Sequence, residues 1–194
     1  GLTAEQWPQS RGPGGQGEAD ATHLPLEWSE TRNVAWKVPV PGLGWSSPVV
    51  ADGRVWLTTA TGDDPRKGDV SLRLLGYDEA SGRELVNAVV FTVRSASEIN
   101  PKNSWASPTP IVEGDRVFVH FGAEGTAALG TNGQLIWKSR FPYQSQHGGG
   151  GSPVLHGGLL IFNADGSDSA AVIALDAGSG KVKWRRERRV PFDQ

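Results

Sequence analysis

The sequence predicts an all-β fold, specifically a β-propeller, on two observations. A small residue and a proline precede an apolar strand three times, in GWSSPVV (44–50), SWASPTPIV (104–112) and GGGGSPVL (148–155). The prolines at positions 48, 108 and 153 are 60 and 45 residues apart, and repeats of about 40–50 residues with four short strands are typical of propeller blades. The second observation is composition, because 26 Gly and 13 Pro among 194 residues indicate a turn-rich β protein.

Each repeat is expected to form one four-stranded antiparallel blade. The blades are predicted over residues 44–91, 104–141 and 148–189. Alternating apolar residues predict the strands, at 47–51, 54–60, 71–79 and 83–91, then 109–114, 116–122, 125–131 and 134–140, and finally 152–157, 159–165, 170–177 and 181–187. Dipeptides such as Asp52-Gly53 and Asn132-Gly133 suit the tight turns between such strands. Insertions are expected at 62–70 and 92–103.

The N-terminal part is predicted to stand apart from the blades. Residues 1–33 are expected to form an irregular arm, because RGPGGQG (11–17) is too rich in Gly for a helix or strand interior. The arm is expected to be anchored between blades by Trp7 and Trp28. Residues 34–38 (VAWKV) alternate like a strand, and their Trp-Lys pair matches the pairs that end the second and third repeats. This pattern predicts a lone outermost strand.

Three blades and one lone strand do not close a ring. Propellers need roughly four to eight blades, so we expect 34–194 to be a partial propeller. The remaining blades would come from sequence outside this chain or from another chain. A small fold of three packed sheets is the alternative.

Charge and composition exclude several partner classes. The net charge is −2, and the chain has no Cys, so we expect no disulfide and no thiolate metal site. It has no apolar run long enough to span a membrane. The basic run 181–189 alternates with Val182 and Trp184, as on the polar side of an edge strand, and we expect no nucleic-acid partner. The chain begins with Gly, for which signal-peptide removal is one explanation.

Four segments, 6–50, 103–129, 147–168 and 172–184, resemble exported proteins of planctomycete-type bacteria that contain pyrroloquinoline-quinone-like (PQQ-like) propeller repeats. The resemblance implies a periplasmic or otherwise exported propeller. One branch of this superfamily comprises quinone-dependent alcohol and sugar dehydrogenases, which bind PQQ and Ca²⁺ in the central funnel. Another comprises scaffolds of outer-membrane protein assembly, which bind partner proteins and no cofactor. The alcohol dehydrogenases use two adjacent cysteines, which this chain lacks.

The candidate ligand-binding residues cluster around the third repeat. His147 precedes the Gly run that enters its inner strand, and Asn163, Asp165 and Asp168 follow its second strand. Loops at strand entries and exits lie at the mouths of a propeller funnel. Oxygen donors suit Ca²⁺, so Asp165 and Asp168 are candidate cation ligands. The competing interpretations are an Asp-Gly turn with local hydrogen bonds and a His147 that only bonds within its loop.

Trp105 is the fifth candidate. Its ring is of the type that stacks on a sugar or a quinone, but Trp45 holds the same place in the first repeat, which favours packing between blades. No motif of a catalytic nucleophile or a phosphate-binding loop occurs.

The sequence therefore predicts a non-catalytic binding or scaffolding module of an exported bacterial protein that holds a protein, peptide or glycan, without a cofactor. One alternative is a fragment of a quinone-dependent dehydrogenase with PQQ and Ca²⁺. The other is a structural component of a multi-chain assembly that completes the propeller.

Overall fold

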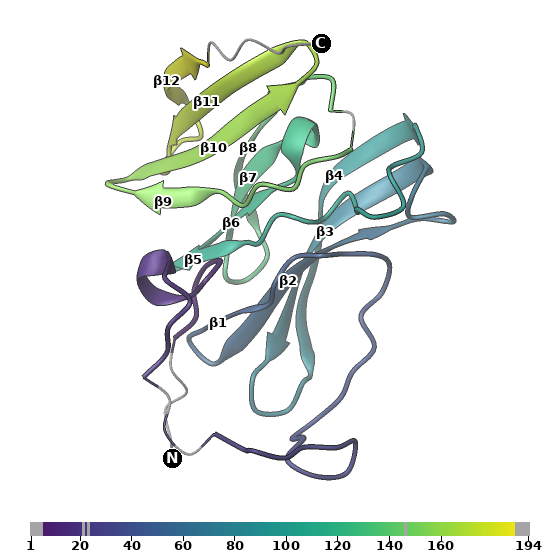
Figure 1. Ribbon diagram of the computed structural model, residues 1–194, viewed down its shortest axis with the longest axis vertical. Coiled ribbons are helices and arrows are strands. Elements are labelled where there is room, and N and C mark those ends of the chain that lie inside the picture. Colours follow the sequence, from purple (N-terminus) through teal and green to yellow (C-terminus); the bar gives the residue numbers. More distant parts are fainter. Residues whose placement is uncertain (1–5, 21, 23, 146, 189–194) are drawn as a thin grey trace.

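The computed structural model describes residues 6–20, 22, 24–145 and 147–188, and these form three successive four-stranded antiparallel sheets (Figure 1). Blade 1 comprises β1 (Val49–Ala51), β2 (Arg54–Thr61), β3 (Gly68–Asp78) and β4 (Glu84–Ala96). Blade 2 comprises β5 (Ile111–Glu113), β6 (Arg116–His120), β7 (Thr126–Gly130) and β8 (Leu135–Ser139). Blade 3 comprises β9 (Val154–His156), β10 (Leu159–Gly166), β11 (Ser169–Asp176) and β12 (Val182–Glu187). Two 3₁₀ turns, η1 (Pro13–Gly15) and η2 (Gly122–Glu124), accompany them.

The predicted all-β class with four-stranded antiparallel blades is confirmed. In every blade the strands lie in chain order across the sheet, as consecutive hairpins require. Blade 1 differs from the expectation in strand length. The ladder between β3 and β4 continues to the pair Gly68↔Ala96, so parts of the expected insertions 62–70 and 92–103 are strand. In the described part of the chain no helix is long and apolar enough to cross a membrane.

The blades pack through one repeated row of side chains, which we call the trailing row. It consists of four residues directly opposite one another across the sheet. In blade 2 these are Ile111, Phe118, Ala128 and Trp137. This row is buried in one apolar cluster with Leu160, Phe162, Ile173 and Leu175 of blade 3. The trailing row of blade 1, namely Val49, Trp56, Gly76 and Val86, packs in the same way against blade 2.

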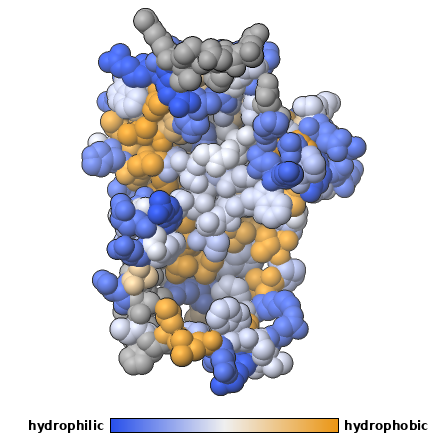
Figure 2. All heavy atoms as spheres, viewed as in Figure 1, coloured by the Kyte–Doolittle hydropathy of each residue, from blue (hydrophilic) through white to orange (hydrophobic). Residues whose placement is uncertain are grey.

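The trailing row of blade 3 belongs to neither of the apolar clusters that join the described blades. It consists of Val154, Ile161, Ala174 and Trp184. Val154 is exposed, Ile161 and Trp184 are half-buried, and Ala174 is buried. Val154 is 55% exposed, whereas its counterpart Ile111 is 3% exposed. Figure 2 shows hydrophobic residues at the surface over blade 3, at the upper left of the view. An apolar row of this kind on a sheet face is a surface that another layer normally covers.

The predicted lone strand 34–38 does not form, because no described strand lies beside it to accept its hydrogen bonds. Its tryptophan nevertheless takes the expected place. The Trp36 Nε1–H donates to the carbonyl of Glu79 at 2.7 Å, and its indole lies against Gly82. On blade 3, Trp137 donates to the carbonyl of Ala177 at 2.9 Å and lies against Gly180. Trp36 therefore sits on blade 1 as Trp137 sits on blade 3.

The N-terminal arm follows the innermost strands. The backbone N–H groups of Trp7 and Val50 each donate to the other's carbonyl, at 2.7 and 2.9 Å. Val112 N–H donates to the carbonyl of Pro8 at 2.8 Å. The arm thus bridges β1 and β5, and Trp7 anchors it there. The same expectation for Trp28 is wrong, because that side chain is 72% exposed.

Candidate functional site

Two blade-to-blade linkers and one turn enclose a pocket. The linker between β4 and β5, the linker between β8 and β9, and η2 all contribute to its walls. Figure 1 shows η2 and these linkers at the same end of the blades. The cavity has a volume of about 350 Å³, and Trp105, Glu124 and Tyr143 are among its lining residues. We call it the linker pocket.

The glycine run before the third inner strand brings the walls of the pocket together. A Cβ at Gly122 would lie 2.8 Å from the Cα of Gly149, and a Cβ at Gly149 would lie 2.6 Å from the Cα of Gly122. Only glycine at both positions lets η2 touch the linker that enters β9. The run that marked the third repeat in the sequence is therefore a packing contact at this pocket.

Trp105 is the predicted candidate that lines the pocket. Its indole N–H donates to the carbonyl of Arg66 at 3.1 Å, and the same carbonyl accepts the Ile99 N–H at 3.1 Å. The loop between β2 and β3, which lies in the expected insertion 62–70, thus holds the first linker in place. Trp45, which has the same place in the first repeat, is 56% exposed. Repetition of the motif consequently does not give the two side chains the same surroundings.

His147 is exposed and joins the two linkers. Its Nδ1 lies 3.3 Å from the Nδ2 of Asn100, and its carbonyl accepts a hydrogen bond of 2.6 Å from Asn103 Nδ2. These contacts are of the loop-bonding kind that the sequence offered as the alternative to ligand binding. Since Gly148 follows His147 in the pocket wall, they position that wall.

Asp165 and Asp168 have separate partners. An oxygen of Asp168 accepts the backbone N–H of Gln144 at 2.7 Å, and Gln144 lines the pocket. Asp165 accepts a hydrogen bond of 2.8 Å from Asn163 and forms an ion pair with Arg188. Burial raises the pKa of Asp165, but these hydrogen bonds outweigh it and leave the pKa below its ordinary value.

These contacts do not fit a quinone–calcium centre. Ca²⁺ takes 6–8 oxygen ligands with several carboxylates among them. The Oδ2 of Asp165 is paired with Arg188 and Asn163, while its buried Oδ1 has no hydrogen-bond partner among the described residues. An oxygen of Asp168 accepts a backbone N–H. Across residues 6–20, 22, 24–145 and 147–188, no three His, Cys, Asp or Glu side chains gather around one point. Asp165 and Asp168 therefore each have a protein partner, and their role as cation ligands stays a prediction.

Glu124 and Tyr143 are pocket residues that sequence reasoning missed. Burial raises the pKa of Glu124, and the nearby Arg140 guanidinium partly opposes that rise. Burial also raises the pKa of Tyr143, with a contribution from the charge of Asp165. The only hint in the sequence is that Glu124 stands alone in the turn GAEG (122–125). The packing of blade 2 against the linker is what places both side chains in one cavity.

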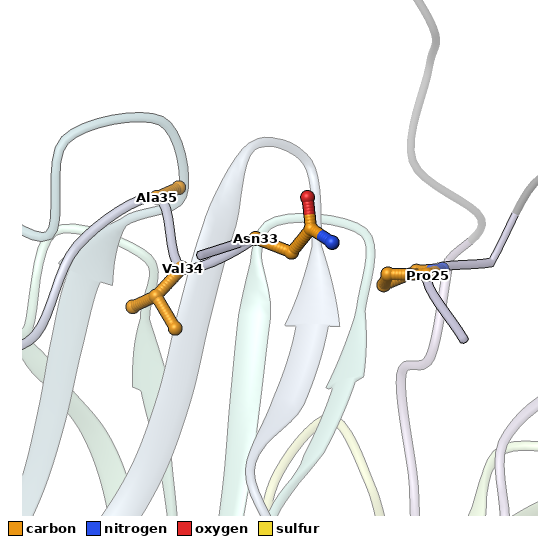
Figure 3. Close-up of a pocket in the computed structure, with 4 residues that line it drawn as sticks. All are labelled: Pro25, Asn33, Val34 and Ala35. Carbon is orange, nitrogen blue, oxygen red and sulfur yellow. The ribbon is translucent and has the colours of Figure 1, made fainter. Parts of the chain in front are cut away.

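A second hollow lies in the N-terminal arm and is lined by Pro25, Asn33, Val34 and Ala35 (Figure 3). Figure 3 shows the Asn33 amide as the one polar side chain among the four. This hollow offers no titratable group, whereas the linker pocket combines aromatic rings with carboxylates. The linker pocket is therefore the candidate site, suited to binding through ring faces and charge.

Solved structures share the fold of this chain. Quinohemoprotein alcohol dehydrogenase ADHIIG from Pseudomonas putida HK5 aligns with a TM-score of 0.53 and 18% identity over 78% of this chain and 22% of that chain. The quinohemoprotein alcohol dehydrogenase from Comamonas testosteroni aligns with a TM-score of 0.50 and 17% identity, over 76% of this chain and 21% of that chain. A europium-containing methanol dehydrogenase aligns with a TM-score of 0.52 and 14% identity, over 74% of this chain and 24% of that chain. The chain thus spans under a quarter of their lengths, and at these identities the likeness shows the fold alone.

Similarity of sequence defines the family. No curated protein matches this chain. The family model described as outer membrane protein assembly factor BamB matches residues 26–149 and again residues 72–193. These matches include all three blades, each built from the repeats that the sequence showed. The chain therefore belongs to this BamB-type family of PQQ-like β-propeller repeat proteins.

Proposed function

We propose that this chain is a non-catalytic binding or scaffolding module of an exported bacterial protein, and that its linker pocket holds part of a protein, peptide or glycan partner. The observation that carries the proposal is the pocket itself, which is lined by Trp105, Tyr143 and Glu124. Aromatic side chains with a few polar groups are the usual lining of a ligand pocket. The family description, an outer-membrane protein assembly factor, supports a protein partner.

The pocket is built to hold its shape. Asn103 fastens one linker to the other through the His147 carbonyl, at 2.6 Å, and Asp168 fastens Gln144, at 2.7 Å. Two of the predicted polar candidates, His147 and Asp168, thus support the walls of the pocket. A rigid pocket loses little conformational entropy when a partner binds, which supports a role in presentation and capture.

The proposed module includes further blades. Trp36 lies on blade 1 as an outer-strand tryptophan of a preceding blade would, and the trailing row of blade 3, with Val154 exposed, belongs to no apolar cluster between the described blades. Both features support a longer propeller, in which 34–38 pairs with another blade. Those blades belong to the same protein in our proposal, and to other chains in the alternative of a multi-chain assembly.

Selection of ligands tests the binding proposal. The chain is screened against phage-displayed heptapeptides and against cello-, chito- and malto-oligosaccharides. We expect selected ligands to lose at least about tenfold in affinity on Trp105→Ala, as for an aromatic anchor residue. Trp45→Ala is the matched control and should leave the affinity unchanged, because Trp45 is outside the pocket. Ligands that bind equally well to the Trp105 variant would overturn the proposal, as would a screen with no binder.

A quinone-dependent dehydrogenase fragment is the second candidate, favoured by the likeness to quinohemoprotein alcohol dehydrogenases. It predicts that PQQ with Ca²⁺ raises the melting temperature and changes the quinone absorbance. We expect neither, because Asp165 and Asp168 are engaged with other partners. Ca²⁺ alone and PQQ with a chelator are the controls. A rise seen only with both additions, and abolished by Asp168→Asn, would support the dehydrogenase instead.

A further inference from the structure

The linker pocket carries charge of one sign. Its lining includes the carboxylates of Glu98 and Glu124, and none of the described residues that line it is Lys or Arg. Glu98 is exposed, with the Nζ of Lys67 at 4.0 Å. Glu124 is half-buried in η2. Clefts lined by one sign of charge concentrate ligands of the opposite sign, so the pocket selects for a cation.

Glu124 has no direct counter-charge within the described part of the chain. No hydrogen bond or ion pair there reaches its carboxylate, and Arg140 acts on it only through space. The guanidinium of Arg140 is directed elsewhere, since it donates to the carbonyl of Thr92 at 3.2 Å and lies 5.2 Å from the ring centre of Phe91. A partly desolvated carboxylate without a partner gains most from an incoming cation that can donate hydrogen bonds.

The aromatic side chains of the pocket favour the same ligand. The N–H of Trp105 is already used by the Arg66 carbonyl, so the indole can offer a ligand only its ring. Tyr143 provides a second ring from the opposite linker. The faces of such rings attract ammonium and guanidinium groups, with Trp the best partner.

We propose that the linker pocket binds a cationic side chain, the ammonium of a lysine or the guanidinium of an arginine in a peptide partner, with Glu124 as its counter-charge and Trp105 and Tyr143 as its aromatic contacts. This inference rests on the proposed binding function and names the ligand of the same pocket. A volume of about 350 Å³ is at the low end of the range for ligand pockets, which suits one side chain with its adjoining backbone.

Peptides that differ only in the charge of one side chain test whether the pocket prefers a cationic ligand. Three heptapeptides of Gly and Ser, acetylated and amidated, carry Lys, Arg or norleucine at the centre, and n-butylammonium and cellohexaose serve as further probes. Binding is measured by calorimetry and by saturation-transfer NMR at low and high salt. We expect the Lys and Arg peptides to bind at least about tenfold more tightly than the norleucine peptide, and more tightly than n-butylammonium. The preference should shrink at high salt.

Two variants assign the effect to the pocket. Glu124→Gln should lower the affinity for the Lys and Arg peptides to that for the norleucine peptide. Glu113→Gln, at an exposed position at the end of β5, should leave all three affinities unchanged. Circular dichroism checks that both variants fold. Equal binding of the lysine and norleucine peptides, or a preference that survives Glu124→Gln, would refute the cationic ligand and leave the binding function standing. Binding of cellohexaose that requires Trp105 would also refute the cationic ligand and leave the binding function standing. If no probe binds and the library selection yields no ligand, both the cationic ligand and the binding function are refuted.

Discussion

Replacing Trp137 with alanine is expected to lower the free energy of unfolding by about 3–5 kcal/mol, the cost of removing a large buried aromatic side chain. Trp137 is 9% exposed in β8. Its indole lies against Gly180, where a Cβ would collide with the ring, and its N–H donates to the carbonyl of Ala177 at 2.9 Å. The ring of Phe118 lies beside it, with 6.2 Å between centroids. Loss of Trp137 therefore opens a cavity between blades 2 and 3.

Trp184 is the matched control, because it occupies the same place in the trailing row of blade 3. Trp184 is half-buried and belongs to neither apolar cluster between the blades, so Trp184→Ala should cost about 1–2 kcal/mol, clearly less than Trp137→Ala. Urea unfolding followed by far-ultraviolet circular dichroism measures both variants. Equal costs for the two variants would show that blade 3 is already covered, or that blades 2 and 3 do not pack as described.

The variant Trp137→Phe distinguishes the contribution of the aromatic ring to stability from that of the indole hydrogen bond. Phenylalanine keeps most of the apolar contact with blade 3 but leaves the carbonyl of Ala177 with only the longer hydrogen bond from the Nη1 of Arg116, at 3.4 Å. The loss of one hydrogen bond of this kind costs about 0.5–1.5 kcal/mol. We therefore expect the Phe variant to fall between the wild type and the Ala variant.

The strands could be predicted because their signals are local. Alternating apolar residues and Gly turns determine the twelve strands in the described part of the chain, and the same signals recur in each repeat. Residues 34–38 show the limit of this inference. Their sequence alternates like a strand, but a strand needs a neighbour, and only the indole of Trp36 finds its place on blade 1.

The site was harder to predict because its contacts join distant segments. Trp105 was found through its repeated motif, yet its indole partner Arg66 is 39 residues away. The chemistry of Asp168 suggested a cation ligand, but its partner is a backbone N–H of Gln144, 24 residues earlier. Glu124 has no motif at all. Its importance comes from its position in the cavity with Trp105 and Tyr143, which only the packing of the linkers creates.

Acidification from pH 6.5 to pH 4 is expected to destabilise the chain through one buried histidine. His120, in β6, is 2% exposed, and its Nδ1 lies 2.8 Å from the Oγ1 of Thr126. Its ring packs against that of Phe162 of blade 3 at a tilt of 34°, with 4.5 Å between centroids. Burial lowers the pKa of His120 from 6.5 to about 4, because a charged imidazolium would lose its hydration between the blades.

Proton linkage gives the direction and the size of the change in the free energy of unfolding. Between pH 6.5 and pH 4 the unfolded chain binds a proton at His120 and the folded chain does not, so stability falls as the pH falls through this window. The total loss is about 3 kcal/mol, from 1.36 kcal/mol for each pKa unit. Below pH 4 both states are protonated and the contribution is constant. Burial raises the pKa of Glu124, so its protonation opposes the loss near the acidic end.

His120→Phe should flatten this dependence, whereas His156→Gln, at an exposed position, should leave it intact. The Phe variant has lower stability at neutral pH, since the hydroxyl of Thr126 loses its partner, but the slope between pH 6.5 and pH 4 is the quantity that decides. Hydrogen bonds and ion pairs lower the pKa of Asp69, Asp78 and Asp176, so these groups destabilise the fold only at more acidic pH. An unchanged slope in the Phe variant would mean that His120 is protonated in the folded chain and that blades 2 and 3 admit water between them.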